Sequence, residues 1–293
     1  NDLTLVGGTG NIGFVGTLTS GVKNLTLTTT GGLSFGGAVS GLGDILVNAA
    51  SAGLSGTSIS ATSLVAASAT TGGTAVALNG AVSITGQQNY TDKLVLETSG
   101  VNNISVAGVS TTTGTISLKT NLGTLNVGTL IATAGAVTLT HGNTLTIGGN
   151  IFAGTTLGVT TNNGASIIVG TGTNVSMQAL SGGISLGGAV TLVNDLTVSA
   201  TGAVAFGNTL NSTVGQRRAL SISTIYNSVT FSGAVGQVTR LGAISIAGTP
   251  TGIDAGTKNI SAASFVNTGA ASGTINIQGI QNYDGALGLN LLT

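Results

Sequence analysis

The chain has 293 residues, of which 41% are hydrophobic and only 5% are charged, with seven basic and seven acidic side chains. That apolar content excludes a disordered chain, and a net charge of zero with no basic cluster beyond Arg217 and Arg218 argues against nucleic-acid binding. The absence of cysteine excludes disulfides and thiolate metal sites, and no apolar run approaches the length of a membrane-spanning helix.

Short β-strands are predicted along the whole sequence, because runs of aliphatic residues alternate with threonine or serine and are separated by glycine-rich turns. No stretch of 12 or more residues has helical spacing. The expected strands cover residues 3–6, 24–28, 33–39, 44–47, 81–85, 93–97, 115–119, 136–140, 144–147, 166–169, 184–190, 195–199, 219–223, 229–231, 243–247 and 274–277.

The strands alternate with period 2, as in residues 25–28, 137–140 and 145–147, which places aliphatic side chains on one face and hydroxyls on the other. One face of each strand is therefore expected to be buried. With 50 glycines for turns and a single proline, Pro250, nearly every backbone N–H is available for sheet hydrogen bonds.

A short module recurs in which a bulky apolar residue is followed by one further residue and then by Gly-Ala-Val, at residues 35–39, 78–82, 186–190 and 231–235. A longer echo relates residues 84–96 to residues 277–289. The offsets between copies are roughly multiples of 20 to 22 residues, a period typical of solenoids. We therefore predict an all-β fold, a parallel β-helix (β-solenoid) with about 20–22 residues per turn and about 13 turns. Hairpin pairing of neighbouring strands, giving a sandwich or an antiparallel repeat array, remains open.

No composition shift or charged linker marks a domain boundary, so residues 1–293 are predicted to form a single continuous solenoid domain.

The Gly/Thr/Ser/Ala-rich strands, the Gly-Ala-Val module and the Gln-Asn-Tyr segments at residues 88–90 and 281–283 resemble repeat regions of filamentous-haemagglutinin-like and autotransporter-like bacterial surface adhesins. This resemblance covers most of the chain. It implies a right-handed β-helical shaft, exported to the cell exterior and used in adhesion or matrix building.

Residues suited to catalysis are sparse, and we predict no enzyme activity, no cofactor and no metal site. The one histidine, His141, is expected to lie in a surface turn, without a second ligand or base. Among the acids, only Asp92 and Glu97 are close in sequence, and Lys93 and Lys119 indicate a solvated charged patch rather than a carboxylate pair for glycoside hydrolysis.

Three tyrosines are candidate contact residues, namely Tyr90, Tyr226 and Tyr283. They could fill packing positions in a repeated turn, or they could contact a neighbouring protomer or a glycan, since tyrosine is enriched at interfaces.

Both terminal segments are strand-like and apolar, and neither has the polar character of a solenoid cap. We expect them to be covered by further turns of the same polypeptide or by an identical subunit, the second giving a homopolymer. The candidate assembly residues are Leu3, Leu5, Val6, Leu287, Leu289, Leu291 and Leu292.

These features predict a structural extracellular protein, a subunit or shaft segment of a bacterial surface filament, sheath or giant adhesin. The alternative is an adhesin binding module that recognises a glycan or a host protein through turn residues.

Overall fold

The computed structural model describes residues 1–47, 53–56, 58–66, 78, 80–269, 271 and 274–289. The chain is all-β and forms a parallel β-solenoid of about 13 turns, and its described residues contain no helix. It divides into two compact units, Asn1–Leu145 and Thr146–Thr293. The prediction of one continuous domain over residues 1–293 is not tested by this division and stays a prediction.

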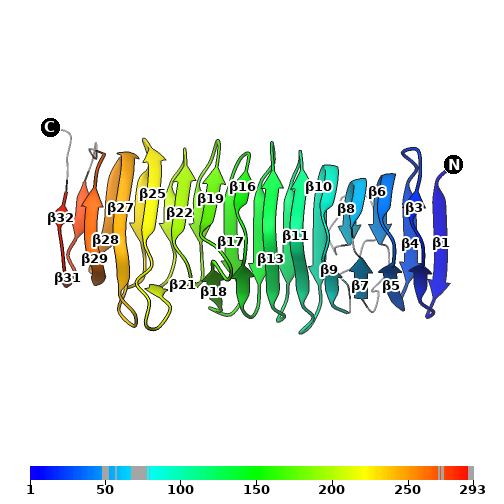
Figure 1. Ribbon diagram of the computed structural model, residues 1–293, viewed down its shortest axis with the longest axis horizontal. Coiled ribbons are helices and arrows are strands. Elements are labelled where there is room, and N and C mark those ends of the chain that lie inside the picture. Colours follow the sequence, from blue (N-terminus) through cyan, green and yellow to red (C-terminus); the bar gives the residue numbers. More distant parts are fainter. Residues whose placement is uncertain are drawn as a thin grey trace. The chain divides into compact units, whose positions relative to one another are not determined.

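The first unit consists of three stacks of parallel strands, and each strand inside a stack pairs with the strands one turn before and one turn after it (Figure 1). The first stack contains β1 (Leu3–Gly8), β4 (Leu25–Thr29), the last parts of β6 (Val39–Val47), β8 (Ile59–Ala66) and β10 (Gln88–Thr98), then β12 (Ile116–Thr120) and β14 (Val137–His141). The second contains β2 (Ile12–Phe14), β5 (Gly32–Phe35), β7 (Gly53–Gly56), β9 (Val82–Ile84) and the first parts of β11 (Ile104–Thr112) and β13 (Leu125–Ala132). The third contains β3 (Leu18–Thr19), the first parts of β6, β8 and β10, and the last parts of β11 and β13.

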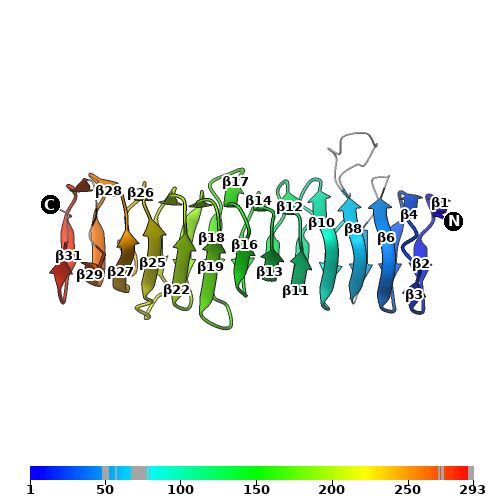
Figure 2. The ribbon, with the colours of Figure 1, turned by 90° about the horizontal axis from the view of Figure 1, so that it is seen from above.

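The second unit is built in the same way, and Figure 2 shows its strands from above. One stack contains β17 (Leu157–Thr161), β20 (Ile184–Leu186), β23 (Val204–Phe206), β26 (Ser228–Phe231), β28 (Gly252–Gly256) and β30 (Ile275–Ile277). Another contains β18 (Ser166–Val169), β21 (Ala189–Leu192), β24 (Leu210–Ser212), the first part of β29 (Ile260–Asn267) and β31 (Gln281–Tyr283). The third contains β16 (Ile151–Ala153), β19 (Val175–Ala179), β22 (Leu196–Ala200), β25 (Leu220–Ile225), β27 (Leu241–Thr249), the last part of β29 and β32 (Leu287–Gly288). β15 (Leu145–Ile147) contains the boundary between the units.

The length of a turn varies around the predicted period. In the first unit it ranges from 19 residues, between register partners Ile45 and Leu64, to 30, between Leu64 and Leu94. Part of this variation falls inside the long strands, since the register of β10 against β8 shifts by one residue between Tyr90 and Lys93. Each described strand pairing is parallel, which excludes the hairpin alternative for the described residues.

The core consists of aliphatic and aromatic columns that run along each unit's stacked strands. The alternation predicted from sequence is observed, for example in β4, where Leu25 and Leu27 are buried while Thr26 and Thr28 are half-buried. Phenylalanines stack in register, with Phe14 and Phe35 at 5.3 Å and 10° between ring planes in the first unit. Phe206 and Phe231 stack at 5.4 Å and 11° in the second unit. Successive turns therefore bury their apolar side chains against one another.

Two of the predicted strands are wrong in their extent, because the Gly-Ala-Val module marks a corner and not the interior of a strand. The predicted strand at residues 33–39 stops at Phe35, and a new strand starts at Val39. The predicted strand at 184–190 likewise breaks at Gly187 and Gly188, between β20 and β21. The other predicted strands each overlap an observed one, whereas short strands such as β2, β3 and β16 were not predicted.

Candidate functional site

The first strand of the chain has one paired edge. β1 pairs with β4 through Leu3↔Leu25 and Leu5↔Leu27, and no other described strand pairs with β1. Leu3 is 45% exposed and Leu5 is half-buried, although their partners in β4 are fully buried. Val6 is 74% exposed and pairs with a threonine on the outer face of β4. The candidate assembly residues Leu3 and Leu5 thus continue the core columns to an open edge, whereas Val6 lies on the outside.

The last described strand, β32, has a similar environment in the second unit. It pairs only with β29 among the described strands, through Phe265↔Leu287. Leu287 is 51% exposed and Leu289 is 45% exposed. Ile280, which the sequence analysis did not single out, is 74% exposed between β30 and β31. Leu291 and Leu292 lie outside the described residues.

Tyr90 is a core residue, which corrects its assignment as a contact residue. Its side chain is 2% exposed, and its hydroxyl donates a hydrogen bond of 3.1 Å to Oε1 of Gln88, which is itself fully buried. Burial raises the pKa of Tyr90 well above its usual value. A side chain enclosed in this way cannot touch a protomer or a glycan.

The other two tyrosines differ in exposure. Tyr283 is half-buried, with its ring 6.3 Å from that of Phe265, and its hydroxyl donates to Oε1 of Gln281 in the same arrangement as Tyr90. Burial raises the pKa of Tyr283 to about 12. Tyr226 is 72% exposed at the end of β25 and has a left-handed backbone, φ 59°. Tyr226 is therefore the tyrosine most available to a partner.

His141 is buried, contrary to the expected surface turn. It ends β14, one residue after Thr140, which is in register with Lys119 of β12. Thr98 and Thr120, which are register partners, likewise end β10 and β12, and each donates a hydrogen bond of 2.8 Å to a carbonyl oxygen of the loop that follows its strand. Nδ1 of His141 contacts the Asn143 carbonyl oxygen in the same manner. Burial lowers the pKa of His141, partly offset by that hydrogen bond, so its role is to close a turn.

The described part of the chain contains no candidate metal centre. Three or more potential metal ligands do not gather anywhere in it. The four charged residues of the predicted patch form two ion pairs, in which Nζ of Lys119 lies 2.8 Å from Glu97 Oε1 and Nζ of Lys93 lies 3.6 Å from Asp92 Oδ2. The Glu97 side chain is only 14% exposed, so this acid is less solvated than predicted. A groove of about 310 Å³ on the second stack of the first unit is lined by serine, glycine, asparagine and apolar residues, with no ionisable group.

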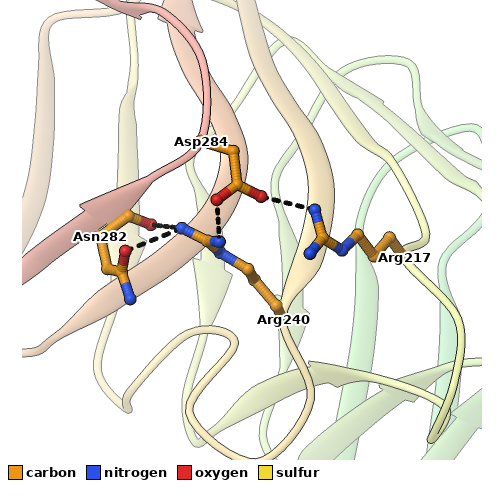
Figure 3. A network of polar contacts seen from close by, with 4 residues as sticks. All are labelled: Arg217, Arg240, Asn282 and Asp284. Atoms are coloured by element: carbon orange, nitrogen blue, oxygen red, sulfur yellow. Dashed lines mark hydrogen bonds and ion pairs between the residues drawn. The ribbon is translucent and has the colours of Figure 1, made fainter.

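One polar network was not predicted, and it involves two of the chain's three arginines (Figure 3). The Asp284 carboxylate, in the turn after β31, accepts hydrogen bonds from Nη1 of Arg217 at 2.5 Å and from Nη1 of Arg240. Nη2 of Arg240 also donates to the carbonyl oxygen of Asn282 at 2.7 Å and to its Oδ1 at 2.8 Å. Local sequence patterns give no signal for contacts between residues 44 and 67 positions apart.

Comparisons of the chain with protein-family models, with curated protein sequences and with solved structures found no match. None of the described segments is a helix long and apolar enough to cross a membrane.

Proposed function

We propose that this protein is a structural β-solenoid, a subunit or shaft segment of a bacterial surface filament, sheath or giant adhesin, and not an enzyme. In this proposal the protein acts outside the cell, and its terminal strands stack on further solenoid turns. The next turns belong either to another copy of the chain or to the same polypeptide.

The observation that carries the proposal is the open edge of the first and last described strands. β1 and β32 each pair on one edge only among the described strands, and each has one leucine about half exposed, Leu3 and Leu287, in register with a buried side chain. An unpaired parallel edge offers free N–H and C=O groups to an incoming strand, and covering the leucines would bury apolar surface. Contacts between unlike ends of identical subunits generate open filaments.

The fold and composition are also compatible with a mechanical role. Backbone hydrogen bonds link successive turns within each unit, and phenylalanine and aliphatic columns fill the interior. Because only 5% of residues are charged, outer faces of serine and threonine can approach one another with little charge repulsion.

Sedimentation velocity over a concentration series tests the proposal with single charged substitutions. Leu3→Lys and Leu289→Lys place a charge at the two open edges and should each weaken self-association at least tenfold. Thr138→Lys adds the same charge to the exposed face of β14 and should behave like the unmodified chain. A chain that stays monomeric at every concentration, or equal effects of all three substitutions, would overturn the proposal.

A second candidate function, an adhesin module that binds a neutral glycan or a host protein, is favoured by Tyr226 alone. Its ring is exposed, and its turn is fixed by a 2.9 Å hydrogen bond from the Tyr226 N–H to the Thr249 carbonyl oxygen. Nδ2 of Asn227 also donates to the Thr201 carbonyl oxygen at 2.7 Å. Glycan-array binding that is abolished by Tyr226→Ala would support this function, and identical array profiles for both chains would exclude Tyr226 from it.

A further inference from the structure

The terminal turn, defined as residues 275–289 with β30, β31 and β32, is the least buried part of the second unit. Each residue of β30 is half-buried, and Leu287 of β32 is 51% exposed. In the preceding turn, Ile253 and Phe265 are fully buried. Because the terminal turn is covered by described strands on one side only, apolar burial contributes less to its stability than to that of an interior turn.

Ion pairs and hydrogen bonds compensate for this low burial. Asp284 lies between two arginines, and Arg240 donates three hydrogen bonds to the segment from Asn282 to Asp284. The Arg240 side chain is only 18% exposed, against 49% for Asp284 and 58% for Arg217. Since a partly desolvated, charge-assisted bond is stronger than an exposed one, Arg240 is the main anchor and Arg217 the weaker one.

These contacts reach across several turns. Leu241 is in register with Ala262, and Ala262 is in register with Tyr283, so Arg240 lies two turns before the segment that it holds. Arg217 lies one turn earlier still, because the Gly242 N–H donates to the Arg218 carbonyl oxygen. Backbone hydrogen bonds connect only adjacent turns, whereas these side chains connect the terminal turn directly to turns two and three positions earlier in the second unit.

We infer that Arg217, Arg240 and Asp284 form a charge latch that keeps the terminal turn docked, and that the latch controls whether its open edge is ordered enough to accept another strand. The second half of this inference rests on the proposed assembly function. When the latch opens, the terminal turn frays and the edge loses the fixed geometry that strand addition requires.

The latch should respond to salt more than to mild acid. The side chains of Arg217 and Asp284 are exposed, so salt screens the attraction between them. The Debye length falls from about 10 Å at 0.1 M salt to about 3 Å at 1 M. Hydrogen bonds from Arg217 and then from Arg240 hold the pKa of Asp284 below its ordinary value, so the carboxylate stays ionised in weakly acidic solution. Among the described residues, these two arginines are the charged groups that contact the Asp284 carboxylate.

Hydrogen exchange measured by mass spectrometry tests the latch at concentrations where the chain is monomeric. Arg240→Gln should accelerate amide exchange in residues 275–289 about tenfold, and Arg217→Gln about two- to threefold. Lys258→Gln is the matched control, because Lys258 is an exposed cation of the same unit without an ion pair to any described residue, and it should leave the exchange unchanged. Peptides from residues 157–206 report whether each variant is folded.

Equal exchange in Arg240→Gln and Lys258→Gln would overturn the latch, whatever the state of assembly. If a variant does not fold, salt gives the same test in the unmodified chain, since 1 M NaCl should accelerate exchange in residues 275–289 and not in residues 157–206. Sedimentation then tests the control of assembly, where Arg240→Gln should weaken association and Lys258→Gln should not. Faster exchange with unchanged association in Arg240→Gln would refute the role of the latch in assembly. An unmodified chain that never associates would refute the proposed function and leave the exchange result intact.

Discussion

Replacing Phe206 by alanine should lower the free energy of unfolding of the second unit by about 4 kcal/mol. Phe206 is 1% exposed, and its ring stacks on Phe231 on one side, while Leu186 is its register partner on the other. Truncating a buried phenylalanine costs about 3–5 kcal/mol, a value that includes the cavity left behind. The stacked ring pair accounts for about 0.5–1.5 kcal/mol of this loss.

Two variants separate this effect from a general consequence of mutation. Phe206→Leu keeps most of the buried volume and should cost about 1–2 kcal/mol. Phe152→Ala makes the same chemical change on β16, where Phe152 is half-buried between the buried Ile151 and Ala153, and should cost at most about 1 kcal/mol.

The assay is urea denaturation followed by circular dichroism, combined with native-state hydrogen exchange of peptides from β20, β23 and β26. A double-mutant cycle between Phe206→Ala and Phe231→Ala should give a coupling of about 0.5–1.5 kcal/mol. If Phe206→Ala costs no more than Phe152→Ala, or if the coupling is zero, stacked side chains do not stabilise the solenoid as described.

Three further predictions concern the first unit. Gly142→Ala should lower the melting temperature by several degrees, because a Cβ at this position would clash with the Asn121 carbonyl oxygen. A Cβ at Gly16 meets open space, so Gly16→Ala should change the melting temperature little. Equal effects of the two substitutions would refute the clash. Tyr90→Phe should cost about 1–2 kcal/mol in urea denaturation by leaving a buried amide oxygen without its donor, and an unchanged midpoint would contradict that role. Because burial lowers the folded-state pKa of His141, its contribution to stability is present above the unfolded value of 6.5 and is lost as the pH falls from there through the lowered pKa. In His141→Thr this part of the pH dependence of the urea midpoint should disappear. If the variant keeps the same pH dependence, another titrating group causes it.

The parallel solenoid could be predicted from the sequence because the information is local and repeated. Alternating apolar and hydroxyl residues, such as those at 25–28, identify a strand with one buried face. The corners were harder, since Gly-Ala-Val reads as the continuation of a strand. In the structure Phe35 ends one strand and Val39 starts the next, and the three residues between them form the bend.

The environment of single side chains could not be predicted in the same way. Tyr90 and Tyr226 have the same chemistry, yet one points into the core of the first unit and the other projects from a turn of the second. Alternate residues of a strand face the core, so the direction of a side chain depends on the number of residues between it and the preceding corner. Turns of variable length change this number from one turn of the solenoid to the next. The contact of Asp284 with Arg240 depends on stacking two turns apart, which no short sequence window contains.

Electron microscopy of the purified chain over a concentration series tests most directly whether the open edges of β1 and β32 associate. Whether the natural partner is another copy or further turns of a longer polypeptide, the described strands leave one edge of β1 and one edge of β32 unpaired. We therefore expect filaments of uniform width that lengthen with concentration and that Leu3→Lys shortens. Single particles of constant length at every concentration would contradict the proposal that the terminal strands of this solenoid associate with further solenoid turns.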